Sequence, residues 1–160
     1  MDVELSSPIK FGQTLIWSEE GTSTLFLTEE SLKIFVNNKL TGCDFVESNV
    51  LGYKGESRAS TPLPRLWELR VTNWVAIDRE SSGYVLEEPA CDICGWTQVK
   101  KTRQGIWLAE SSDLDFLVVR EYPLHILVTE RVMELIVAAE LHPCALVPQD
   151  KIEFEGVFVD

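Results

Sequence analysis

Two cysteines separated by two residues form the one recognisable chemical motif of the sequence. Cys91 and Cys94 are followed directly by Gly95. A Cys-x-x-Cys-Gly turn can place two thiolates on one metal ion, because glycine lets the backbone fold back beneath them. A closed zinc site needs four ligands, and the chain has no second Cys-x-x-Cys motif. The other candidate ligands do not stand at zinc-knuckle spacing: Cys43, Cys144, His125 and His142.

The cysteine pair therefore has two interpretations. It indicates either a zinc site that uses Cys91 and Cys94, or a tight turn that has lost its metal. We expect no other cofactor. A thioredoxin-like redox pair would stand at the start of a helix, and no amphipathic helix pattern follows Gly95.

The remaining residue types offer no catalytic constellation. Ser111 and Ser112 have no nucleophile-elbow sequence around them. Gly52 and Gly55 lack the Lys-Ser that follows a phosphate-binding loop. With only two histidines, Ser-His-Asp or Cys-His arrangements have few ways to form. We predict that the protein is not an enzyme.

The charge balance points to a protein partner. The 26 acidic and 14 basic residues give a net charge of −12, which repels phosphate backbones and argues against a nucleic-acid partner. Such a field would attract a basic protein. The expected contacts are the long loop at residues 51–64 and the acidic pairs Glu19-Glu20 and Glu87-Glu88.

The sequence also predicts the compartment and the number of domains. No run approaches the ~20 apolar residues of a membrane helix, and residues 1–10 lack the pattern of a signal peptide. Four cysteines are too few for a disulfide scaffold in 160 residues. We expect one cytoplasmic domain over residues 1–160, with reduced thiols and no membrane contact.

A repeat is the most informative pattern in the chain. Residues 25–29 read Leu-Phe-Leu-Thr-Glu, and residues 126–130, which follow at an offset of 101, read Ile-Leu-Val-Thr-Glu. Each Thr-Glu is followed by apolar residues at helical spacing, and Cys43 then matches Cys144. The matching helical positions are Leu32, Phe35, Val36 and Leu40 in one copy and Met133, Ile136, Val137 and Leu141 in the other.

Each copy is predicted to form a strand, an amphipathic helix and a second strand, over residues 24–48 and 125–149. Thr28 and Thr129 are expected to be the N-caps, their hydroxyls accepting a hydrogen bond from a helix N–H. The matching cysteines are expected to be small buried side chains. An internal duplication explains the pattern, and two independent strand–helix–strand units are the alternative.

Strand patterns fill the space between the copies. Apolar and polar residues alternate over residues 66–75, which is typical of a half-buried antiparallel strand. Further short strands are predicted at 84–86, 106–109 and 116–119. Asp113 and Asp115 are expected to lie in a solvated turn. The fold class is therefore α+β, with a mostly antiparallel sheet and two amphipathic helices.

The second half of the chain resembles the bacterial double-CXXCG-motif immunity proteins and their relatives among polymorphic-toxin immunity proteins. The resemblance covers residues 65–155. Its motifs are the segments 91–95, 115–119 and 126–141, the last with Thr129-Glu130-Arg131, and residues 146–154 as a closing strand. One of the family's two CXXCG motifs is absent here. The resemblance implies a small cytoplasmic protein that binds and neutralises a cognate toxin domain.

The leading hypothesis is therefore stoichiometric inhibition of a basic toxin domain. The alternative is a zinc-stabilised structural or adaptor module, which chelation would strip of zinc and unfold. A third reading is an enzyme that uses Cys91 or Cys94 as a nucleophile or redox pair, and a thiol pKa near that of free cysteine would exclude it.

Overall fold

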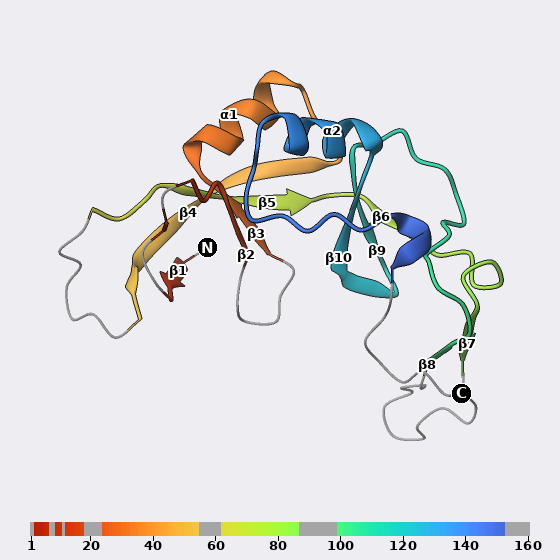
Figure 1. Cartoon of the computed structure of the whole chain (residues 1–160). Helices are drawn as coiled ribbons and strands as arrows, with labels where there is room; N and C mark the ends of the chain where they lie inside the picture. The colour runs from red at the N-terminus through yellow and green to blue at the C-terminus, as the bar shows by residue number, and fades with distance from the viewer. Residues whose placement is uncertain are drawn as a thin grey trace.

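Over the residues that it describes, the computed structural model of this protein combines three β-sheets with two α-helices (Figure 1). The helices are α1, Glu29–Asn37, and α2, Glu130–Ala138, and a short 3-10 helix follows at Gln149–Lys151. The sheets are mostly antiparallel, so the predicted α+β class is confirmed. The structure describes residues 2–6, 9–10, 12–17, 24–54, 62–86 and 99–152.

The largest sheet has five strands, with β5 at its centre. Its neighbours pair antiparallel, except for the parallel pair β1 and β4. The predicted alternation holds in β5, where Trp67 and Leu69 are buried and Arg70 is exposed. The single strand predicted over 66–75 is wrong, because β5 ends at Val71 and residues Trp74–Val75 pair in a different sheet. In spatial order the strands are β1 (Asp2–Leu5), β4 (Cys43–Tyr53), β5 (Leu66–Val71), β3 (Leu25–Leu27) and β2 (Leu15–Trp17).

The second half of the chain contributes two smaller sheets. Strand β9 lies between β10, to which it is antiparallel, and β6, to which it is parallel. Strands β7 and β8 form an antiparallel pair. The strands predicted at 84–86 and 116–119 are confirmed. The bounds are β6 (Trp74–Val75), β7 (Tyr84–Leu86), β8 (Val99–Lys101), β9 (Phe116–Val119) and β10 (Tyr122–Val128).

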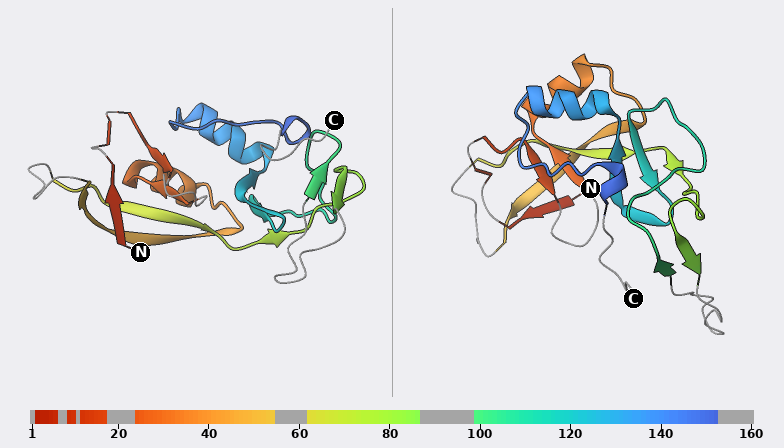
Figure 2. Two further views of the ribbon diagram at one scale, coloured as in Figure 1. Left: turned by 90° about the horizontal axis from the view of Figure 1, so that it is seen from below. Right: turned by 45° about the vertical axis from the view of Figure 1, so that its right-hand side comes forward.

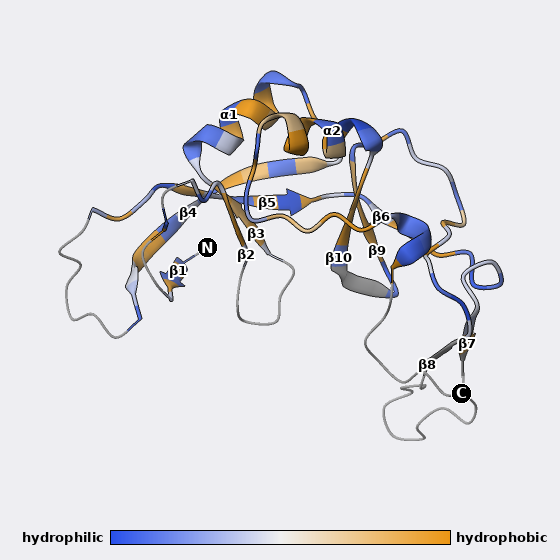
Figure 3. Ribbon diagram, viewed as in Figure 1, coloured by the Kyte–Doolittle hydropathy of each residue, from blue (hydrophilic) through white to orange (hydrophobic). Residues whose placement is uncertain are grey.

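The two helices lie next to each other on one side of the sheets (Figures 1 and 2). Their apolar faces share one core with residues of both larger sheets. Figure 3 shows that β9 and the end of β10 that leads into α2 are largely hydrophobic. The central members of the core are Phe35, Val132 and Ile136 from the helices, and Leu27, Leu69 and Phe116 from the strands.

Both helices begin after the threonine that the sequence predicts. Thr28 and Thr129 have extended backbone and stand at the N-caps. Neither hydroxyl caps its helix, so that part of the prediction is wrong. The Thr129 hydroxyl donates to Asp115 instead (3.0 Å), and the Thr28 hydroxyl lies 3.4 Å from that of Ser31. At Thr129 a tertiary partner therefore replaces the local capping bond, whereas at Thr28 a side chain of the same helix does.

The sequence repeat has a structural counterpart in two β-hairpins that share their register at three pairs. Three of the four residue pairs of β9 and β10 lie 101 residues after the three pairs of β2 and β3. After each helix, the matching residues Lys39 and Glu140 both have φ of 51°. The copies therefore begin one strand earlier than predicted. The pairs are Leu15↔Leu27, Ile16↔Phe26 and Trp17↔Leu25, and then Phe116↔Val128, Leu117↔Leu127 and Val118↔Ile126.

Each copy binds the other through the turn that follows its helix. The Thr41 N–H donates to the Asp115 carboxylate (2.9 Å). In the same way, the His142 N–H donates to the Thr14 hydroxyl (3.0 Å). The offset of 101 relates Thr14 to Asp115 and Thr41 to His142. The two copies are thus intertwined, and each turn is held by the start of the other copy's hairpin.

The second strand predicted within residues 125–149 does not form, so that part of the prediction is wrong. Residues 144–148 have no regular secondary structure, whereas the matching residues 43–47 belong to β4. Strand β4 is held along its length by β5. In the described part of the chain, no strand occupies the corresponding place beside β10, which ends its sheet.

Two smaller predictions also need correction. Residues 106–109 form no strand, only an isolated bridge between Leu108 and Ile77. The loop predicted at 51–64 starts later, because residues 51–53 are the end of β4. In both segments, pairing with a neighbouring strand determines whether the residues form a strand. The composition of a single segment does not show whether such a neighbour is present.

Gly42 is required at the turn between α1 and β4. It has φ of 82°, and a Cβ there would collide with the Phe116 carbonyl oxygen. Replacing Gly42 by alanine is expected to lower the free energy of unfolding by about 2 kcal/mol, from the left-handed backbone and the overlap together. Urea denaturation measures the loss.

Gly12→Ala is the matched control for this variant. Gly12 has φ of 80°, but no atom lies within 4 Å of the place a Cβ would take. Only the backbone cost remains there, about 1 kcal/mol. Equal losses in the two variants would show that the approach to Phe116 does not contribute.

Candidate functional site

Of the predicted contact loop at 51–64, residues 51–54 and 62–64 are described, whereas the other residues predicted to form a site lie outside the described residues. They are the cysteine pair Cys91 and Cys94 and the acidic pairs Glu19-Glu20 and Glu87-Glu88. Their zinc-binding and partner-binding roles stay predictions. Within the ranges that the structure describes, no group of three or more His, Cys, Asp and Glu side chains is placed to hold a metal ion.

The two other cysteines pack in the core, as predicted. Cys43 and Cys144 are half-buried and lie against the hydrophobic cluster beneath the helices. Burial raises the pKa of Cys43 to about 12, with the charges of Asp44 and Asp115 adding to the shift. Burial also raises the pKa of Cys144 and lowers that of His125, a half-buried residue of β10. A thiol whose pKa is raised is a poor nucleophile and metal ligand at neutral pH.

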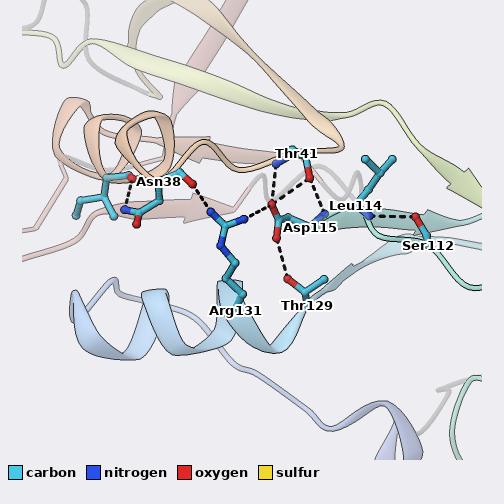
Figure 4. Close-up of polar contacts among 8 residues, drawn as sticks. Asn38, Thr41, Ser112, Leu114, Asp115, Thr129 and Arg131 are labelled. Atoms are coloured by element: carbon cyan, nitrogen blue, oxygen red, sulfur yellow. Dashed lines mark hydrogen bonds and ion pairs between the residues drawn. The ribbon is translucent and has the colours of Figure 1, made fainter.

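A buried carboxylate, that of Asp115, joins the two copies of the repeat (Figure 4). Its side chain is 5% exposed and meets Arg131 at 2.9 Å. The backbone N–H and hydroxyl of Thr41 donate to Oδ2 at 2.9 and 3.1 Å, and the Thr129 hydroxyl donates to Oδ1 at 3.0 Å. A second nitrogen of Arg131 donates to the Asn38 carbonyl at the end of α1.

These partners hold Asp115 in its charged form. Burial by itself raises the pKa of this carboxyl, but the hydrogen bonds from Thr41 and Thr129 and the charge of Arg131 together bring the pKa below its usual 3.8. The predicted solvated turn is therefore wrong at Asp115, although Asp113 is exposed. Because donors surround this carboxylate, it joins structural elements and does not face a substrate.

Exposed apolar side chains lie on the second copy. Met133 and Val137 are four residues apart on α2, so they share one face of the helix, and Val137 is 66% exposed. Leu146 and Val147 follow in the irregular segment, and Val147 is 57% exposed. Most of the matching residues in the first copy are half-buried: Leu32, Phe45 and Val46.

Unpaired carboxylates accompany this apolar surface. The cation of α1, Lys33, pairs with Glu29, and the cation of α2, Arg131, pairs with Asp115. Lys39 follows α1 in an exposed turn. The exposed carboxylates on and after α2 form no ion pair with a described residue: Glu130, Glu134 and Glu140. The exposed side of α2 thus combines apolar side chains with negative charge.

Sequence reasoning missed this surface because periodicity alone assigns Met133 and Val137 to the core. They continue the apolar stripe that includes the buried Ile136. The sequence signal that distinguishes Met133 and Val137 from buried core residues is their position on the edge of the apolar stripe, beside Glu130 and Glu134. Only the placement of neighbouring strands decides whether such an edge is covered.

Comparison with protein-family models, curated proteins and solved structures finds no match to this chain. The resemblance to double-CXXCG-motif immunity proteins therefore stays a prediction. Among the helices described, none is long and apolar enough to cross a membrane.

Proposed function

We propose that this chain is an immunity protein, which binds a cognate bacterial toxin domain in the cytoplasm and neutralises it as a stoichiometric complex. The observation that carries the proposal is the surface of the second copy. On α2, the exposed apolar residues Met133 and Val137 accompany the carboxylates Glu130 and Glu134, which form no ion pair with a described residue.

The two components of this surface have different physical roles. Apolar side chains that lose contact with water supply most of the affinity of a protein interface. Unpaired carboxylates such as Glu134 attract a basic partner and favour its correct orientation. The net charge of −12 extends this attraction beyond direct contact. The apolar side chains and the negative charge both favour a protein with a basic surface as the partner.

An inhibitor of this kind needs a rigid, complementary surface and no reacting group. The intertwined copies supply the rigidity, because Asp115 and Thr14 each bind the turn of the other copy. The acidic pairs Glu19-Glu20 and Glu87-Glu88 would add to the attraction of a basic toxin domain.

Calorimetry with the toxin domain encoded by the neighbouring gene tests the proposal. We expect 1:1 binding, loss of toxin activity in the complex, and affinity that falls as the salt concentration rises from about 0.05 to 0.5 M, because salt screens exposed charges. A domain that does not bind, or that stays active when bound, would contradict the proposal.

A further inference from the structure

Among the described residues, the first copy of the repeat has a strand that has no counterpart in the second copy. In the first copy, β5 pairs with the free edge of the hairpin strand β3, and Leu25 and Leu27 stand opposite Leu69 and Trp67. All three residues of β3 are buried. The equivalent strand of the second copy, β10, is the last strand of its sheet, and its residues 126–128 are half-buried.

The outer edge of β10 presents backbone groups that a strand could bind. The Thr129 N–H donates to the Asp115 carbonyl at 3.1 Å, and hydrogen-bonded pairs alternate along an antiparallel ladder. The N–H and C=O of Leu127 therefore bond to β9, whereas those of Ile126 and Val128 point away from it. No described residue bonds to the backbone of Ile126 or Val128 on that side.

The flank of α2 lies above this edge, by analogy with α1. Helix α1 lies against both β3 and β5. Arg65, the residue that precedes β5, pairs with Glu47 at 2.9 Å, and its charge contributes only after Lys33 to the lowered pKa of Glu29. The offset of 101 places Glu130 where Glu29 stands, and Met133 where Leu32 stands.

We propose that the edge of β10 and the overhanging flank of α2 bind an extended, basic segment of the partner protein as an added antiparallel strand. The segment takes the place that β5 has in the first copy. Apolar residues of the segment would stand opposite Ile126 and Val128, as Leu69 and Trp67 do opposite Leu25 and Leu27. A basic residue of the segment would pair with Glu130 or Glu134, which are exposed and form no ion pair with a described residue.

Charge favours a basic segment of a partner over the two longest segments of this chain that lie outside the described residues. Segments 87–98 and 153–160 contain acidic residues and neither lysine nor arginine. A second copy would bring another net charge of −12 to the same edge. This inference rests on the proposed function for the identity of the partner, but the strand-binding edge is tested without it.

The probe is a capped peptide with the sequence of residues 64–72, which carries β5 and Arg65. Hydrogen exchange of the full chain is followed at the amides of Ile126 and Val128. At a peptide concentration of 100 Kd, these amides should exchange about 100-fold more slowly, while Leu127 changes little because β9 already holds its amide. The amides of Leu25 and Leu27 show whether the peptide has instead displaced β5.

Charge variants test the basic requirement. A peptide with Arg65→Glu should bind more weakly, and Glu130→Arg and Glu134→Arg in the protein should each weaken binding of the original peptide about threefold at low salt. Glu80→Arg, at an exposed turn residue, is the control and should leave binding unchanged.

Several results would overturn the inference. One is slow exchange at Ile126 and Val128 in the free protein, which would show that the chain covers its own edge. A second is protection that grows with protein concentration alone, which would identify a second copy as the occupant. A third is a peptide that protects neither amide.

Experiments with the toxin domain distinguish a failure of this inference from a failure of the proposed function. A neutralised 1:1 complex in which both amides still exchange rapidly would contradict the strand-binding edge and support the function. Protection by the peptide without binding of the toxin domain would contradict the function and support the edge.

Discussion

Replacing Phe35 by alanine is expected to lower the free energy of unfolding by about 4 kcal/mol, since the variant loses a buried aromatic ring and leaves a cavity. Phe35 is completely buried. Its ring contacts Phe45 of the first copy, at a centroid distance of 6.4 Å, and Phe116 of the second copy, at 5.9 Å. The substitution therefore weakens the contact between the copies as well as the packing beneath α1. Urea denaturation with an unchanged m-value would measure the loss.

Two further variants define what the Phe35 result means. Val36→Ala, at the next residue, removes an exposed side chain and is expected to change stability by less than about 0.5 kcal/mol. Phe35→Leu keeps most of the volume and should cost about 1.5 kcal/mol. A loss in Phe35→Ala that is no larger than that of Val36→Ala would show that the shared core does not hold the copies together.

Replacing Asp115 by alanine is expected to cost about 3 kcal/mol, because it leaves buried donors without their acceptor. The backbone N–H of Thr41 and the hydroxyl of Thr129 both lose a partner, while Arg131 is half exposed and regains water. Asp115→Thr should recover about half of the loss. Thr14, at the equivalent place of the first copy, uses its hydroxyl to accept the His142 N–H.

The contribution of Asp115 depends on pH in a defined direction. Its pKa in the folded protein lies below the usual 3.8, so the charged form favours folding. The stability that it contributes is complete above that value and is lost as the pH falls through the lower pKa of the folded state. The difference between the wild type and Asp115→Thr should therefore be constant near neutral pH and shrink below about pH 4.

The matched control for Asp115 is Asp113→Thr, the same substitution at an exposed carboxylate two residues earlier. It is expected to change stability by less than about 0.5 kcal/mol. If the difference between the wild type and Asp115→Thr stays the same from neutral to acid pH, the carboxylate charge is not what holds the two turns.

The local features of this fold follow from the sequence. Helices begin after Thr28 and Thr129 because an apolar stripe of helical period follows each threonine. Alternation over residues 66–71 gives β5. The offset between the copies could be found by comparing short motifs, because an equivalent fold needs the same apolar residues at the same spacing. These signals all lie within about ten residues along the chain.

Contacts between distant segments decided the rest. Asp115 is buried by a turn 74 residues away, which no local pattern shows. The matching residues 43–47 and 144–148 have similar sequences, yet only the first segment is a strand, because β5 pairs with it. A strand needs a neighbour to bond its backbone, whereas a helix bonds within itself. The sequence by itself therefore determined the two helices and the repeat, and the tertiary structure decided which strand edge is filled and which is open.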